Sequence, residues 1–153
     1  IVSEDGREFY AINSEYDPAR ATEWLKENVL KNLIPTGLVA TPFISPDEMR
    51  SAIRGFCWPS TEKWAYGTTE FFGYYSSYDW YLLCRLMGGM LNTPKGWPYY
   101  CKDIMQVMDH YRIPRNRMPP DPIGEHNALV DARWNRSAHA AIVAMELEGP
   151  ITI

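Results

Sequence analysis

The sequence predicts a single α/β or α+β domain with a mixed sheet. Three observations support this: β-prone segments come first, helical periodicities follow with at least one strand between them, and the length suits one core. A chain of 153 residues is long enough for one hydrophobic core and too short for two domains. Apolar residues make up 46% of the chain and charged residues 22%, as in ordinary folded domains. We therefore assign residues 1–153 to one domain.

The chain begins within a predicted β-hairpin. Ile1-Val2-Ser3 leads to a turn at Asp5-Gly6, and residues 7–13 form the second arm. An Asp-Gly pair between two β-prone runs is a strong hairpin signal. Because proteins rarely begin in the last residues of a hairpin arm, we expect that sequence preceding Ile1 has been removed or left out.

Helical signals occupy most of the remaining chain. Asp17-Pro18 opens the first predicted helix, because Asp caps helices well and Pro suits their first turn. Ser45-Pro46 opens the second in the same way. The predicted helices span approximately residues 17–33, 46–56, 78–86, 100–111 and 126–148. The aromatic, β-prone segment 63–75 is the best candidate for a central strand.

The composition narrows the classes of function. A net charge of −4 argues against a broad cationic surface for long duplexes, but a metal-dependent nuclease site is itself acidic until metal binds. No apolar run approaches the ~20 residues of a membrane span, and no signal peptide is visible. Aromatic residues reach 14%, which serves packing or, alternatively, stacking on nucleobases.

The cysteines indicate a reducing compartment. Cys57, Cys84 and Cys101 are odd in number and show no CxxC spacing. They fit free thiols better than a disulfide framework or a zinc site. We therefore expect a cytoplasmic protein.

Two clusters of residues suggest a metal site. At the start of the last predicted helix, His126 precedes Asp131 by five residues. Five helical residues turn by about 500°, so the imidazole reaches the carboxylate only if His126 lies in the entry turn. Asp79 lies where a predicted strand gives way to a helix, a place where α/β sheets bind ligands. Two carboxylates and one His are the ingredients for Mg²⁺ or Mn²⁺ coordination with a general base.

Each of these residues also has a structural interpretation. The helix dipole favours an acidic residue such as Asp79 near a helix N-terminus. His126 would be a surface or capping residue, and Asp131 a solvated residue within a helix. From these residues alone, an acidic metal site and purely structural roles both remain possible interpretations.

The order of these motifs resembles that of the DEDDh superfamily of 3′→5′ exonucleases. Residues 126–132 look like its third motif, H-x4-D, and Tyr78-Asp79 looks like its second. Further segments are similar, in the same order, to the ribonuclease AS group of polyadenylate-specific 3′-exoribonucleases: residues 4–11, Trp24, Leu83-Cys84 and residues 117–120.

The resemblance implies a ribonuclease H-like fold that cuts single-stranded RNA from its 3′ end into nucleoside 5′-monophosphates. Two ions, Mg²⁺ or Mn²⁺, would lie about 4 Å apart and stabilise the attacking and leaving oxygens. Asp79 and Asp131 would be metal ligands, and His126 would be the general base. A homodimer is also suggested. Predicted substrate contacts come from Tyr75, Ser76, Tyr78 and Trp80. Trp80 is the best candidate for stacking on a base, and it would alternatively be a core residue.

One motif of the superfamily is absent from this chain. Its D-x-E pair belongs on the first strand, and no acidic pair in the sequence replaces it. The first strand is therefore expected to be missing, and the chain alone to be nearly inactive. The rival interpretation is a catalytically inactive domain of the same fold that binds nucleic acid or another protein. A D-x-E pair upstream of Ile1 would favour the enzyme.

Overall fold

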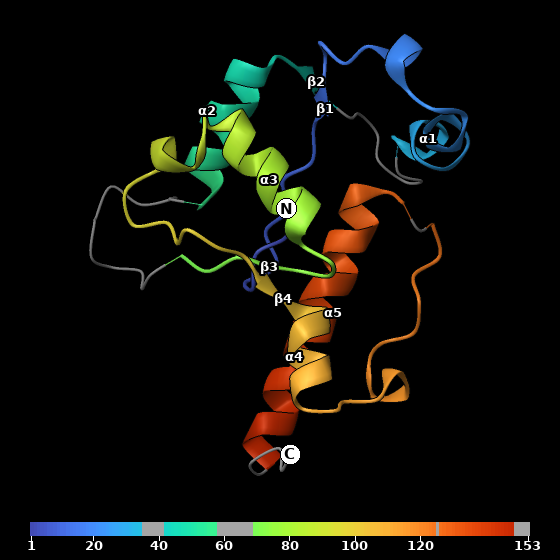
Figure 1. The fold of residues 1–153 in the computed structure, drawn as a ribbon, viewed down its shortest axis with the longest axis vertical. Coiled ribbons are helices and arrows are strands. Elements are labelled where there is room, and N and C mark those ends of the chain that lie inside the picture. Colours follow the sequence, from blue (N-terminus) through green and yellow to red (C-terminus); the bar gives the residue numbers. More distant parts are fainter. Residues whose placement is uncertain (35–41, 58–68, 125, 149–153) are drawn as a thin grey trace.

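The computed structural model describes residues 1–34, 42–57, 69–124 and 126–148 as a mixed α/β structure (Figure 1). The long helix α5 runs along the longest axis, with α4 beside it and with α2 and α3 toward one end. The strands and α-helices are β1 (Ile12–Asn13), α1 (Glu23–Asn28), β2 (Phe43–Ile44), α2 (Pro46–Cys57), β3 (Phe72–Gly73), α3 (Ser77–Leu86), β4 (Lys102–Asp103), α4 (Ile104–His110) and α5 (Ala128–Glu148).

The described strands form two separate parallel pairs. In the first pair, β1 lies beside β2 with Ile12 opposite Phe43. In the second, β3 lies beside β4 with Gly73 opposite Asp103. Antiparallel pairing among the described residues is limited to a bridge between Val2 and Glu8. The α/β class is thus confirmed, whereas the single mixed sheet of a ribonuclease H-like fold stays a prediction.

The N-terminal hairpin is confirmed in a short form. Ser3 N–H donates to the Arg7 carbonyl at 2.9 Å, and Gly6 supplies the left-handed φ of 90° at the turn. Hydrogen bonds from the Ser3 hydroxyl and from Arg7 hold the pKa of Asp5 below its usual value.

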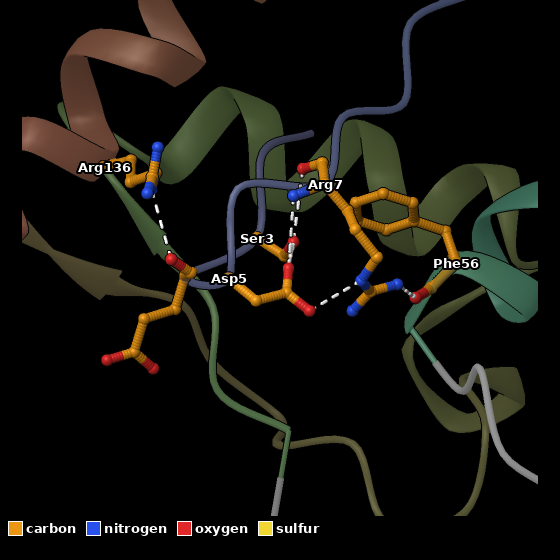
Figure 2. A network of polar contacts seen from close by, with 6 residues as sticks. Ser3, Asp5, Arg7, Phe56 and Arg136 are labelled. Atoms are coloured by element: carbon orange, nitrogen blue, oxygen red, sulfur yellow. Dashed lines mark hydrogen bonds and ion pairs between the residues drawn. The ribbon is translucent and has the colours of Figure 1, made fainter.

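The hairpin is tied to two helices by polar contacts (Figure 2). The Arg7 guanidinium donates to the Phe56 carbonyl in α2 at 2.9 Å, and Arg136 of α5 donates to the Glu4 carbonyl at 3.2 Å. Arg133 of α5 also holds both Glu8 carboxylate oxygens at 2.7 Å. The hairpin is therefore attached to α5 as well as to α2.

Three of the predicted helices are confirmed in α2, α3 and α5. The start of α2 is a reciprocal cap: Glu48 N–H donates to the Ser45 hydroxyl oxygen at 3.3 Å, and Ser45 N–H donates back to the Glu48 carboxylate at 2.8 Å. Such local signals are legible in sequence, which is why these boundaries were predictable.

Two other helices differ from the prediction. In the segment 17–33, Asp17 caps only a 3₁₀ turn over Pro18–Arg20, and Thr22 starts the shorter α1 by accepting from Leu25 N–H at 3.3 Å. In the segment 100–111, Asp103 accepts from Met105 N–H at 2.9 Å, so α4 begins only at Ile104 and is preceded by β4.

The predicted central strand falls partly outside the described residues, which omit 58–68. Of the rest, β3 alone is strand, and it lies between two hydrophobic clusters. Phe71 packs on a cluster built around Ile53, Met87 and Trp97 of the α2–α3 end. Phe72 packs on the main cluster, whose buried members are Ile104, Met108, Ile113, Met118, Trp134, Ala138, Ile142 and Met145.

Two predictions from the sequence concern disulfide bonds and membrane-spanning helices. All three cysteines are free thiols, as predicted. Within the part of the chain that the structure describes, every helix lacks the combination of length and apolar character needed to cross a bilayer.

Candidate active site

The junction between β3 and α3 holds Asp79 and the predicted substrate residues. Gly73 ends β3 in a place too tight for a side chain, because a Cβ there would lie 2.8 Å from Ser76 Cβ. Tyr75 then takes a left-handed conformation with φ of 53°, which is uncommon for a bulky residue. Ser76 follows immediately before α3. The chain thus turns sharply from strand to helix, and the tight turn fixes the direction of α3.

Asp103 at the end of β4 holds this turn closed. Its carboxylate accepts hydrogen bonds from Tyr75 N–H at 3.2 Å, Ser76 N–H at 2.8 Å and the Ser76 hydroxyl at 3.2 Å. It accepts a fourth from Met105 N–H, so the same side chain starts α4. Sequence reasoning missed Asp103, although an Asp directly before a helical apolar run is an N-cap signal.

Asp79 lies in the first turn of α3. The residue is exposed overall, yet the protein around its carboxyl group removes enough water to raise the pKa of Asp79 above its usual value. Burial raises the pKa of the nearby Cys101 thiol as well, and the negative charges of Asp103 and Asp79 add to this effect. The Asp79 carboxylate is therefore partly desolvated, and its negative charge reaches the neighbouring Cys101 thiol.

The four predicted substrate residues divide into two kinds. Tyr75 and Tyr78 present their rings to solvent, with 65% and 81% of the residue exposed. Ser76 is buried and engaged with Asp103, and Trp80 is half-buried with its ring 5.4 Å from that of Phe71. Contacts with substrate stay a prediction for all four, and Ser76 and Trp80 have structural roles in addition.

The turn before α5 holds His126. The helix starts at Ala128, so His126 lies outside it and meets the condition for its ring to lean toward Asp131. Its backbone is left-handed, with φ of 67°. The next residue, Asn127, is buried and caps α5 by accepting from Leu129 N–H at 3.0 Å and Val130 N–H at 3.2 Å. His126 is thus the last residue before the cap of the helix that bears Asp131.

Segments from the N-terminal third of the chain pack against this turn. The Asn127 side-chain amide donates to the Asn32 carbonyl at 2.5 Å and to the Tyr10 hydroxyl at 3.4 Å. The Trp24 ring of α1 lies 5.3 Å from the His126 ring, at an interplanar angle of 69°. The entry turn of α5 is therefore held from the outside by residues about 100 positions earlier in sequence.

Asp131 lies on the buried face of α5. At 100° per residue, it projects within about 20° of Ala138 and about 60° of Trp134, both of which are core residues. Asp131 itself is half-buried. On this face the Tyr74 ring lies 5.1 Å from Trp134, and the Phe72 ring lies 4.0 Å from His139. The helix face that bears Asp131 therefore packs on the strand that leads to Asp79.

The structure thus brings the two predicted clusters onto elements that pack together. His126 and Asp131 lie at the start of α5, and Asp79 follows β3, which contacts α5. Direct convergence of the Asp79 and Asp131 carboxylates stays a prediction. Among the residues that the structure describes, no group of three or more His, Cys, Asp or Glu side chains forms a complete metal site.

The donors present nevertheless fit a hard divalent cation. Mg²⁺ commonly takes one or two protein carboxylates and completes its shell with water and substrate phosphates. The raised pKa of Asp79 reflects a carboxylate short of solvation, which a bound cation would relieve. Asp79 and Asp131 are therefore suited to Mg²⁺ or Mn²⁺, with the remaining ligands coming from outside this pair.

Two curated proteins of Mycobacterium tuberculosis are similar to the chain, the 3'-5' exoribonuclease Rv2179c and, from another strain, the 3'-5' exoribonuclease MT2234.1. Each is 35% identical to it over 137 residues, which cover 87% of this chain and 74% of the relative. No protein-family model matches the chain.

Proposed function

The chain belongs to the same family of 3′-5′ exoribonucleases as these two mycobacterial proteins, and on that basis we propose that the protein hydrolyses single-stranded RNA from its 3′ end. The reaction would release nucleoside 5′-monophosphates. The observation that supports this assignment most strongly is the 35% sequence identity with each relative over 137 residues, which cover 87% of the chain. We extend the proposal to adenylate-rich RNA on the resemblance to the ribonuclease AS group.

Divalent ions supply the charge that stabilises the attacking and leaving oxygens when two of them are bound. In this proposal Asp79 and Asp131 would hold the ions through their carboxylate oxygens. Asp79 lies on α3, which follows β3 after a tight turn, and Asp131 lies on α5, which packs on β3. Both proposed metal ligands are therefore carried by helices that the same strand positions. Rigid elements hold ligands in place better than free loops do.

His126 is the proposed general base. Its imidazole is exposed and lies outside the helix, so a ring nitrogen is accessible to a water molecule. It would accept the proton of the attacking water at that nitrogen. A positioned base of this kind contributes about 10²–10⁴-fold in rate.

Tyr75 and Tyr78 are the proposed stacking surfaces for nucleobases. Tyr75 belongs to the turn before α3 and Tyr78 to the first turn of α3, and both rings are exposed. Stacking is typical of proteins that bind single strands. Each stacked base is worth about 1–3 kcal/mol. The net charge of −4 agrees with this mode of binding, which relies less on a broad cationic surface than duplex binding does.

The proposal is tested by replacing Asp131 in the full-length protein. With 5′-labelled single-stranded RNA and Mg²⁺ or Mn²⁺, the wild type should shorten the RNA from its 3′ end, and Asp131→Asn should stop this. Asp109→Asn is the matched control, because Asp109 is an exposed Asp of α4. Both variants should show the circular dichroism of the wild type.

The same experiment separates the enzyme from the inactive-domain alternative. A wild-type protein that binds the labelled RNA but never shortens it, with either metal, would be a binding domain and not an exonuclease. Robust shortening by Asp131→Asn would leave the reaction class standing and remove Asp131 from the metal site.

A further inference from the structure

We propose that Trp24 is a positioning residue for His126 and holds its imidazole in the orientation needed for proton transfer. This inference rests on the proposed function, in which His126 is the general base. It adds a residue from α1, far from the motifs in sequence. The supporting observation is the contact of the two rings, with centroids 5.3 Å apart and planes at 69°.

The contact has the geometry of a favourable aromatic pair. Aromatic rings prefer edge-to-face arrangements with centroids about 4.5–7 Å apart, because the positive edge of one ring faces the negative face of the other. A T-shaped contact also depends on orientation, so rotation of the imidazole about its side-chain bonds would break it. Trp24 therefore restricts the rotamer of His126.

Restriction from outside is needed because the backbone at His126 offers little support. The residue is exposed and precedes the helix, so the turns of α5 do not enclose its ring. Its left-handed φ of 67° fixes where the side chain departs from the backbone, but staggered rotamers remain available to it. A neighbouring ring is thus the simplest device that selects one of them.

Trp24 is itself held in place relative to this turn. Thr22 caps α1, and the 3₁₀ turn after α1 at Leu30–Asn32 receives the Asn127 side-chain amide on the Asn32 carbonyl. The Tyr10 hydroxyl donates to the neighbouring Leu33 carbonyl. The segment that bears Trp24 and the turn that bears His126 are therefore fixed to each other beside the ring contact.

A different role for Trp24 would be direct stacking on a nucleobase, since 55% of the residue is exposed. The ring contact favours positioning, because the indole already packs against the imidazole of His126. The two roles differ in kinetics: a stacking residue acts on substrate affinity, whereas a positioning residue acts on the rate of the chemical step.

The test uses the full-length protein with single-stranded RNA and compares Trp24→Leu, Trp24→Phe, His126→Ala and the double variant Trp24→Leu/His126→Ala. We expect Trp24→Leu to lower kcat about 10- to 100-fold, as misplaced catalytic groups do, with KM nearly unchanged. Trp24→Phe should restore most of the rate. The double variant should have the same kcat as His126→Ala alone, because Trp24 acts through the imidazole.

The control is Tyr99→Ala, which removes another exposed aromatic ring and should keep the wild-type rate.

A second readout does not depend on activity. In NMR spectra the ring protons of His126 should be displaced by the indole in the wild type and in part by Trp24→Phe, and should return toward ordinary positions in Trp24→Leu. Unchanged His126 resonances, a loss that appears in KM, or losses that multiply in the double variant would each overturn the inference. An unchanged rate for His126→Ala alone would show that His126 is not the general base. In that case Trp24 could not act through it, and the positioning role of Trp24 would be wrong as well.

Discussion

At the scale of single residues, backbone conformation marks the two clusters. Tyr75 and His126 both have left-handed backbones, and each directly precedes the residue before a helix, Ser76 for α3 and Asn127 for α5. Arg112 is the third such non-glycine residue described, and it follows α4, where a left-handed residue commonly ends a helix. Bulky residues in this region are strained and concentrate at functional sites. The two strained turns therefore agree with the two clusters predicted from sequence.

Two glycines give opposite predictions for the same substitution. Gly73→Ala should destabilise the protein by about 1–3 kcal/mol, because the new Cβ would lie 2.8 Å from Ser76 Cβ and the turn must move. Gly55→Ala in α2 should stabilise it by about 0.5–1 kcal/mol, because a Cβ there meets nothing within 4 Å and Ala is the better helix former. Urea denaturation of both variants measures the difference. A Gly73→Ala protein as stable as the wild type would mean that the turn is looser than described.

At the scale of elements, one carboxylate caps α4 and also holds the turn that precedes α3. Asp103 receives four hydrogen bonds from the starts of α3 and α4. Neither the prediction of a strand over 63–75 nor that of a helix over 100–111 contained this link. The helix signals near 78 and 126 were predictable because they are local, while β4 and the Asp103 contacts depend on β3 lying alongside.

Removal of the Asp103 carboxylate should loosen both helix starts. Asp103→Ala should cost about 2–4 kcal/mol in the free energy of unfolding, since it leaves a cap and buried donors unsatisfied. Asp103→Asn retains one acceptor oxygen and should cost less. Denaturation with guanidinium compares these variants with Asp109→Ala, which changes an exposed residue of α4. For this control we expect the free energy of unfolding to change by no more than about 0.5 kcal/mol. Equal stability of all three variants would show that Asp103 is not a cap.

The cap of α2 gives a pH-dependent prediction. Hydrogen bonds from Ser45 lower the pKa of Glu48 from its usual 4.5, so the folded state binds this proton more weakly than the unfolded state does. The contribution of Glu48 to stability is therefore present above pH 4.5 and is lost as the pH falls through the lowered pKa. Melting temperatures of Glu48→Gln should consequently vary less between neutral and acidic pH than those of the wild type. An identical pH dependence of the two proteins would contradict this.

At the scale of the whole molecule, α5 joins the parts. One face packs on β3 and α4, the opposite face receives the hairpin through Arg133 and Arg136, and its first turn receives residues near α1. The α/β class and most helices followed from local patterns. The pairing of the strands could not be predicted in this way, because each parallel pair joins segments about 30 residues apart. No local sequence pattern specifies which of these segments pair. For the candidate site, the motifs predicted Asp79, His126 and Asp131. The contacts of Asp103 with Tyr75 and Ser76, and of Trp24 with His126, depend on the tertiary fold and were not predicted.

The hairpin attachment is testable by a double-mutant cycle. Glu8 and Arg133 form a two-bond ion pair that is partly exposed. Glu8→Gln, Arg133→Gln and the double variant should give a coupling energy of about 0.2–1 kcal/mol that shrinks in high salt. A coupling energy of zero at low salt would mean that the main-chain contacts of Arg7 and Arg136 hold the hairpin without this pair.

The shared carboxylate of Asp103 has a consequence for local opening. The amide hydrogens of Tyr75, Ser76 and Met105 all point at the same two oxygens, although they belong to segments 28 and 2 residues away from Asp103. Any fluctuation that frees one of them displaces the common acceptor from the others. In native-state hydrogen exchange these three amides should therefore open as one cooperative unit, at one free energy and with one dependence on denaturant.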